Sequence, residues 1–130
     1  MIHYITANDI VAIHDMVIKE IGGKLGVREP GLLVSIAEKP KTAFGKSELY
    51  PDVFTKAAVL YEALCNYHVF IDGNKRTALL VMFRFLHING YQLIATNEEA
   101  VSYTLFIAKK KPELNDIARW INSKSKKGIK

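Results

Sequence analysis

The chain of 130 residues contains one cysteine, Cys65, and no long hydrophobic run. One cysteine cannot form a disulfide within the chain, and it leaves no set of thiolates for a zinc site. No apolar stretch reaches the ~18 residues of a membrane span, and the N-terminus lacks the basic and apolar regions of a signal peptide. These absences predict a soluble, cytoplasmic protein in which Cys65, within the apolar run 63–65, is a buried structural thiol.

The charge is unbalanced, because 18 Lys and Arg oppose 13 Asp and Glu, which leaves a net charge of +5. Much of the excess lies in Lys109 to Lys111 and in the segment 123–130, without interleaved aromatic residues. We therefore expect a basic, frayed tail from about residue 123. A small DNA-binding helical protein is an alternative, but nothing in the chain marks a recognition helix, so direct contact with nucleic acid is not expected.

Apolar residues recur at helical spacing through most of the chain, and Gly or Pro separates the segments. The polar stretch 38–50 instead predicts a loop or a short hairpin. No internal repeat or domain linker appears, so residues 1–130 are expected to form one all-α domain, a compact bundle of about six helices. The predicted helices cover approximately residues 6–21, 31–37, 51–66, 74–89, 96–109 and 112–122.

The segment His68 to Thr77 combines a base, a carboxylate, an amide and two cations just before an apolar run. The imidazole of His68 can accept a proton at neutral pH. Asp72 offers the hard carboxylate oxygens that Mg²⁺ prefers when it is shared with phosphates. Gly73 allows a tight turn and a close approach of the backbone to a ligand. These residue types are the ones that phosphate chemistry requires.

Three further residues of this segment, Asn74, Lys75 and Arg76, fall at the start of the predicted helix 74–89. Free N–H groups and the helix dipole favour an anion there, and the two cationic side chains strengthen this preference. A polar turn with Asn74 as helix cap would explain single residues, but a cap requires neither His68 nor the two cations. The segment therefore predicts a phosphate-binding site.

Other conspicuous side chains are better explained by packing. Phe70, inside the segment, is expected to anchor the loop in the bundle. His14 beside Asp15 either reaches the site or has a structural role, and we favour the structural role. A stripe on the helix 74–89 is expected to fill the core, and it comprises Met82, Phe83, Phe85 and Leu86.

The residues quoted so far resemble a known signature. His68-x-Phe70-x-Asp72-Gly73-Asn74-Lys75-Arg76-Thr77-Ala78, with Phe85-Leu86 and Asn89-Gly90 behind it, is similar to the motif of the death-on-curing (Doc) toxins, a branch of the Fic superfamily. The resemblance extends to Ile13-His14-Asp15, Gly22-Gly23, Gly26 and Pro30-Gly31, and so covers most of the chain. It implies the all-helical Fic/Doc fold and the toxin of a toxin-antitoxin pair.

The resemblance also implies an activity. Doc proteins are kinases that transfer the γ-phosphate of ATP to a threonine of elongation factor Tu, which halts translation. His68 would then be the general base, and Asp72 would hold Mg²⁺ against the nucleotide. The remaining group would bind the phosphates and offset the charge that develops during transfer. It comprises Gly73, Asn74, Lys75 and Arg76.

Departures from the wider Fic pattern bear on the type of reaction. Fic enzymes that attach AMP usually have Pro, Gly and Arg at the positions of Val69, Lys75 and Leu79. A lysine in place of glycine changes the space open to phosphate, and the absent arginine removes a phosphate clamp. Both changes favour phosphate transfer. AMP transfer to a protein hydroxyl, or a catalytically degenerate Fic-fold binding module, is the alternative.

Two implied contacts with other proteins complete the resemblance. Fic proteins that inhibit themselves carry the string Ser/Thr-x-x-x-Glu-Gly/Asn, which is absent from this sequence. Inhibition would then come from a partner, a Phd-like antitoxin that lays a helix across the site groove, and the basic chain suits an acidic segment. The stretch 39–50, with Phe44, is similarly placed to the flap that aligns a target strand in Fic folds.

Overall fold

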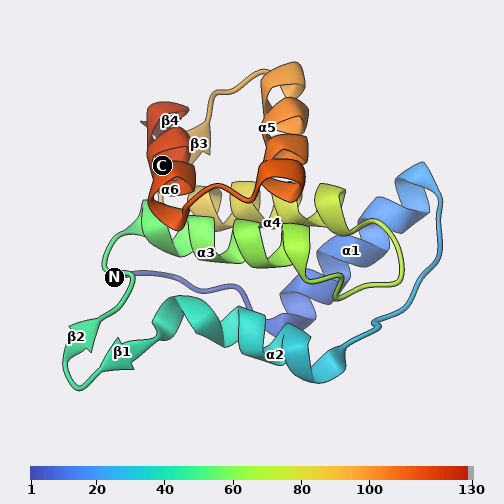
Figure 1. Cartoon of the computed structure of the whole chain (residues 1–130), viewed down its shortest axis with the longest axis horizontal. Helices are drawn as coiled ribbons and strands as arrows, with labels where there is room; N and C mark the ends of the chain where they lie inside the picture. Colours follow the sequence, from blue (N-terminus) through green and yellow to red (C-terminus); the bar gives the residue numbers. More distant parts are fainter. Residues whose placement is uncertain (129–130) are drawn as a thin grey trace.

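The computed structural model describes residues 1–128 and contains six α-helices within them (Figure 1). The all-α fold class is thereby confirmed, and all the predicted helix boundaries agree to within two residues. None of the helices in this described part has the length and apolar character needed to cross a membrane. The helices are α1 (Ala7–Ile21), α2 (Pro30–Glu38), α3 (Val53–Asn66), α4 (Asn74–Ile88), α5 (Asn97–Lys110) and α6 (Leu114–Ser123).

Three helices begin at side chains that cap their free backbone N–H groups. The Thr6 hydroxyl accepts from the N–H of Asp9, and the Asp9 carboxylate accepts from the N–H of Thr6. Thr96 and Glu99 form the same reciprocal pair at the start of α5, and Asp52 accepts from the N–H of Thr55 at the start of α3. These contacts join residues three positions apart, so the sequence predicts the starts of α1 and α5 well.

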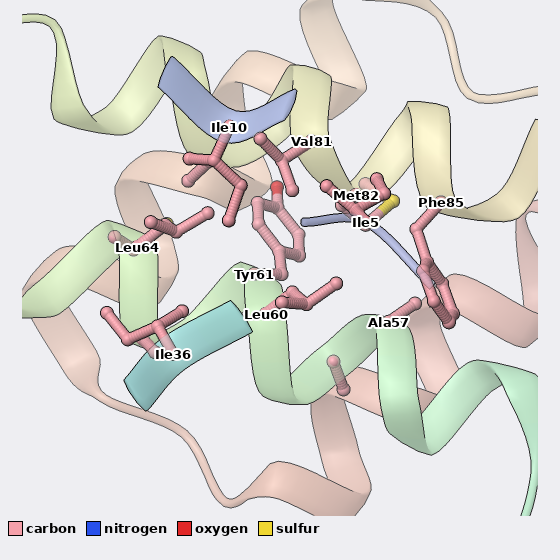
Figure 2. Packing of buried hydrophobic residues seen from close by; sticks show 14 of the residues in the cluster. Ile5, Ile10, Ile36, Ala57, Leu60, Tyr61, Leu64, Val81, Met82 and Phe85 are labelled. Carbon is pink, nitrogen blue, oxygen red and sulfur yellow. The ribbon is translucent and has the colours of Figure 1, made fainter. Parts of the chain in front are cut away.

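The core of the bundle surrounds α3, which packs most extensively against α4 and α6. Figure 2 shows Ala57, Leu60, Tyr61 and Leu64 of α3 among apolar side chains from the neighbouring segments. Cys65 is also buried, and burial raises the pKa of its thiol to about 12. The expectation of a structural thiol is confirmed.

The predicted core stripe on α4 is right at three of its four positions. Met82, Phe85 and Leu86 are fully buried, whereas Phe83 is 40% exposed. Positions 82, 85 and 86 lie three and four residues apart, on one face of the helix. Position 83 is rotated about 100° from position 82 and so faces away from α3. Phe83 is therefore a surface residue, and the prediction that it fills the core is wrong.

The stretch after α2 contains a 3-10 turn, Lys39–Lys41, and a hairpin of β1 (Ala43–Phe44) and β2 (Ser47–Glu48). Buried Lys56, in the first turn of α3, contacts this hairpin through Glu48. Figure 1 shows the hairpin beyond the N-terminal end of α3, whereas the motif loop follows the opposite end. About 15 Å of helix separate Lys56 from Asn66, the last residue of α3 before the motif loop. Of the two predicted alternatives, a loop or a short hairpin, the hairpin is confirmed. The likeness of the stretch 39–50 to the flap of Fic folds stays a prediction.

The C-terminal segment is more ordered than expected. Strand β4 (Ser125–Lys127) pairs antiparallel with β3 (Tyr91–Leu93), so that Tyr91 is opposite Lys127. The Lys124 ammonium also lies 2.8 Å from the Glu99 carboxylate. The prediction of a frayed tail from residue 123 is therefore wrong for residues 123–128, and residues 129–130 lie outside the described part. Backbone pairing with a distant strand holds the segment, and its lysine-rich composition does not reveal that partner.

Candidate active site

The loop between α3 and α4 carries the predicted site residues, and two buried apolar side chains hold it in the bundle. Val69 and Phe70 have almost no exposed surface, so the expected anchoring by Phe70 is confirmed. His68 and Asp72 flank these residues and are exposed. His68 has a φ of 49°, in the left-handed region that few non-glycine residues adopt. The loop thus turns its base and its carboxylate to solvent on either side of a fixed centre.

The Asn74 side chain closes this loop on itself. Its Oδ1 accepts from the Phe70 N–H at 2.9 Å, and its Nδ2 donates to the Phe70 carbonyl oxygen at 3.0 Å. The residue before α4 is Gly73, with a φ of 75°, and no side chain caps the helix. The alternative in which Asn74 is a helix cap is therefore wrong. Sequence reasoning missed this bracing role, because it depends on how the loop folds.

Two backbone N–H groups hold the Asp72 carboxylate. Gly73 donates to its Oδ1 at 2.9 Å, and Lys24, in the segment after α1, donates to its Oδ2 at 3.2 Å. A side-chain Cβ at Gly23 would lie only 2.6 Å from Oδ2, so glycine is needed for this approach. In the sequence, Gly23 belongs to the Gly22-Gly23 pair that is similar to the Doc pattern, and nothing nearby indicates a contact with Asp72. The fold places Gly23 next to the Asp72 carboxylate.

His14 of α1 is fully buried beneath the same loop. Its Nε2 donates to the Asp72 carbonyl oxygen at 2.7 Å. Its ring stacks on that of Phe70, with centroids 3.8 Å apart and planes 4° apart. Both predicted alternatives hold in part, because the ring is buried in the bundle and also contacts the backbone of the motif loop.

A strand-like contact borders the loop on its other side. Val27 and Phe70 form an isolated antiparallel bridge. The Arg28 N–H donates to the Val69 carbonyl oxygen at 2.7 Å, and the Ile71 N–H donates to that of Gly26 at 3.1 Å. The connection between α1 and α2 is therefore the segment that lies along the motif.

A cavity of about 480 Å³ opens beside the loop and the start of α4. One part of its lining is polar, and the other part is apolar. The apolar side chains are Ile71 of the loop, Leu79 on α4, and Val101 and Leu105 on α5, and Thr104 of α5 also lines the cavity. Helical spacing alone does not indicate that α5 forms this wall. The six predicted site residues all line the cavity: His68, Asp72, Gly73, Asn74, Lys75 and Arg76.

This arrangement suits an anionic ligand at the polar end. The first N–H groups of α4 have no partners within the helix and carry the positive end of its dipole. Within residues 1–128, no cluster of three or more His, Cys, Asp or Glu side chains could hold a metal ion. A single carboxylate such as Asp72 fits Mg²⁺ that is shared with substrate phosphates, since such a site uses one or two protein carboxylates.

Comparison with known proteins identifies the family of this chain. Residues 4–86, from the N-terminal segment through most of α4, match the model of the Fic/DOC family. The chain belongs to the Fic/Doc family. The expected membership of the Doc toxin branch and the Fic/Doc fold are both confirmed.

Two named relatives of this Fic/Doc protein are similar over most of their length. Toxin Doc of Mycolicibacterium smegmatis is 38% identical over 95 residues, which are 73% of this chain and 71% of that protein. Protein kinase doc of Escherichia phage P1 is 33% identical over 97 residues, which are 75% of this chain and 76% of that protein. The α5 wall of the cavity lies beyond the residues that match the family model.

Proposed function

We propose that this Doc-family protein is the toxin of a toxin-antitoxin pair and a protein kinase. It would transfer the γ-phosphate of ATP to a threonine of elongation factor Tu in the cytoplasm and so halt translation. One observation carries the proposal: a single cavity is lined by the His68 imidazole, the Asp72 carboxylate and the cationic side chains at the start of α4. The name of the phage P1 relative, protein kinase doc, supports the same reaction class.

His68 would accept the proton of the target hydroxyl. It is exposed, so a protein substrate can reach it, and the buried neighbours Val69 and Phe70 limit the movement of the backbone that carries it. A positioned base of this kind contributes about 10²–10⁴ to a rate. Its neighbour Tyr67 is also exposed, and the Lys39 ammonium lies 5.8 Å from its ring.

Asp72 and the start of α4 would bind the phosphates. Mg²⁺, held by Asp72, would neutralise phosphate charge and orient the transferred group. Lys75, Arg76 and the free N–H groups of the first turn would contact the phosphate oxygens. Gly73 brings the backbone close to α1, because a Cβ there would lie 3.0 Å from Ile18 Cδ1.

Leu79 favours phosphate transfer over AMP transfer. It occupies the position at which AMP-transferring Fic enzymes carry a second arginine, and it lines the cavity together with Val101 and Leu105. A phosphate clamp is thus replaced by an apolar surface. Lys75 and Arg76 line the polar end of the cavity. They would contact the terminal phosphates of the nucleotide, as transfer of the γ-phosphate requires.

Labelled nucleotides test the reaction directly. The protein is incubated with elongation factor Tu, Mg²⁺ and ATP that carries the label on either the γ- or the α-phosphate. We expect label from the γ-phosphate on a threonine of elongation factor Tu. Label from the α-phosphate would identify AMP transfer, and no label from either would identify a binding module. A His68→Asn variant is the control for transfer by a contaminating kinase.

The partner would be a Phd-like antitoxin that binds as a helix. A hollow of about 440 Å³ between α1 and α4 is lined mainly by apolar side chains, including Ile13, Met16, Leu80 and Phe83. A neighbouring hollow shares Met16 and Leu80 and reaches Arg76. An amphipathic helix could lay its apolar face there and bring acidic residues to Arg76.

Substitution in this hollow tests the antitoxin proposal. Phe83→Glu should prevent neutralisation by the antitoxin but leave phosphate transfer intact. Val34→Glu is a matched control, since Val34 is exposed on α2 and does not line either hollow. If the antitoxin still neutralises and binds the Phe83→Glu variant as tightly as the parent, the helix does not lie in this hollow.

A further inference from the structure

A buried imidazole from α1 lies directly beneath the motif loop. His14 is on the inner face of α1, with Ile10 one turn before it and Val17 one turn after it. Its ring contacts the loop at two points, the Asp72 carbonyl oxygen and the Phe70 ring. No other side chain in the described part donates to the Asp72 carbonyl group.

We propose that His14 is a positioning residue for this site. It holds the Asp72 carboxylate in the orientation that receives the metal and the phosphates. The inference rests on the proposed function, because it assigns that role to Asp72. His14 itself would touch neither the nucleotide nor the target. It would act through the backbone of the loop.

The hydrogen bond specifies the tautomer of His14. A carbonyl oxygen only accepts, so Nε2 must carry the hydrogen. In the neutral ring Nδ1 then has a lone pair, and it lies 3.7 Å from the Asp15 Oδ1, which is beyond hydrogen-bond distance. Stacking on Phe70 fixes the plane of the ring. The hydrogen on Nε2 is therefore donated to the Asp72 carbonyl oxygen.

The peptide plane transmits this contact to the carboxylate. The Asp72 carbonyl group and the Gly73 N–H belong to one planar peptide unit and point in opposite directions. When His14 holds the carbonyl oxygen, the Gly73 N–H is turned toward the Asp72 Oδ1, to which it donates at 2.9 Å. The Lys24 N–H holds the other carboxylate oxygen at 3.2 Å. Without His14, the plane could rotate and release Oδ1.

Nuclear magnetic resonance of the unmodified protein gives the first test. We expect the ¹⁵N shifts of His14 to identify the tautomer with hydrogen on Nε2, and this hydrogen to exchange slowly with water. A tautomer with hydrogen on Nδ1, or rapid exchange of the ring hydrogen, would overturn the proposal. This measurement needs no variant and no nucleotide.

Three substitutions give the second test. His14→Gln can place an amide N–H near the position of Nε2, and His14→Phe keeps the stacking but has no donor. Ile10→Val, one turn earlier on the same buried face, perturbs packing without touching the loop. The readouts are amide exchange at Gly73 and Lys24 without nucleotide, and the kcat and KM of transfer at several Mg²⁺ concentrations.

We expect His14→Phe to speed exchange at Gly73 by about tenfold or more, which corresponds to ~1.4 kcal/mol, and to raise the Mg²⁺ concentration needed for half-maximal transfer. His14→Gln should restore both to within about threefold, and Ile10→Val should change neither. Unchanged exchange in His14→Phe, or an equal effect of Ile10→Val, would contradict the proposal. Amide exchange is measured without nucleotide, so it tests the role of His14 even if no γ-phosphate label is transferred. Absence of transfer would contradict the proposed function but not the contact between His14 and the loop.

Discussion

The Lys56 ammonium lies 2.8 Å from the Glu48 Oε1 although the lysine side chain has no exposed surface. The same nitrogen donates to the Pro40 carbonyl oxygen at 3.0 Å and lies 5.7 Å from the centroid of the Tyr4 ring. One buried cation therefore joins α3 to the 3-10 turn, the hairpin and the N-terminal segment. This attachment holds the hairpin at the N-terminal end of α3.

Removal of Glu48 and removal of Lys56 should lower the free energy of unfolding by different amounts. Glu48→Ala leaves a buried cation with fewer acceptors, and we expect the free energy of unfolding to fall by about 1–3 kcal/mol. Lys56→Met removes the charge and keeps most of the packing, so its loss should be smaller. Denaturation in urea measures both values. A larger loss in Lys56→Met than in Glu48→Ala would show that the ion pair itself stabilises the hairpin.

The left-handed backbone at His68 allows catalysis and stability to be separated. His68→Asn removes the base but adopts this conformation readily, so transfer should fall by about 10²–10⁴. The free energy of unfolding should change by less than about 0.5 kcal/mol. His68→Val should in addition lose about 1–2 kcal/mol, because a β-branched residue is strained at a positive φ. Transfer assays and thermal denaturation of the same preparations provide the comparison.

The two adjacent glycines after α1 offer a matched pair for the Asp72 site. Both have positive φ, 93° at Gly22 and 120° at Gly23, but only a Cβ at Gly23 would strike the Asp72 carboxylate. Alanine at either position should cost about 1–3 kcal/mol in backbone strain. Only Gly23→Ala should also raise the Mg²⁺ requirement of transfer. If Gly22→Ala raised it equally, strain in the segment would be the cause.

Burial of Cys65 predicts a protected thiol and an alkaline loss of stability. Because burial raises its pKa from 9.0 to about 12, the folded protein keeps the proton that the unfolded chain releases. The resulting stabilisation is present below pH 9.0 and is lost as the pH rises toward about 12. A thiol reagent near pH ~8 should react only at the rate of unfolding. Rapid labelling of the folded protein would contradict this account, and Cys65→Ser should abolish all labelling.

Sequence reasoning worked best where one segment contains all the interacting residues. The pairs Thr6 with Asp9 and Thr96 with Glu99 predict helix starts, because their partners lie three residues away. The motif residues line one cavity because they lie on one loop and the turn that follows it. Phe83 shows the limit of the same approach, since a list of apolar residues does not by itself specify the buried face.

Contacts between distant segments required the structure. The Asn74 amide turned out to brace the loop, and Gly23 and His14 turned out to contact Asp72. The stretch 38–50 was predicted as a loop or a short hairpin, but the attachment of the hairpin to α3 depends on Lys56. The pairing of β3 with β4 joins segments more than 30 residues apart, which no local pattern reveals.

By itself, the sequence determined the helical class, the helix starts and the chemical inventory of the site. These follow from periodicity, capping and residue type, which act over a few neighbouring positions. Only the tertiary structure decided how the inventory is held. Packing of α1 beneath the loop orients Asp72 through His14, and packing of α5 supplies apolar side chains to the cavity that the cations line. Such contacts form only when several helices are buried against one another, and the spacing of residues within one helix does not indicate which other helices pack against it.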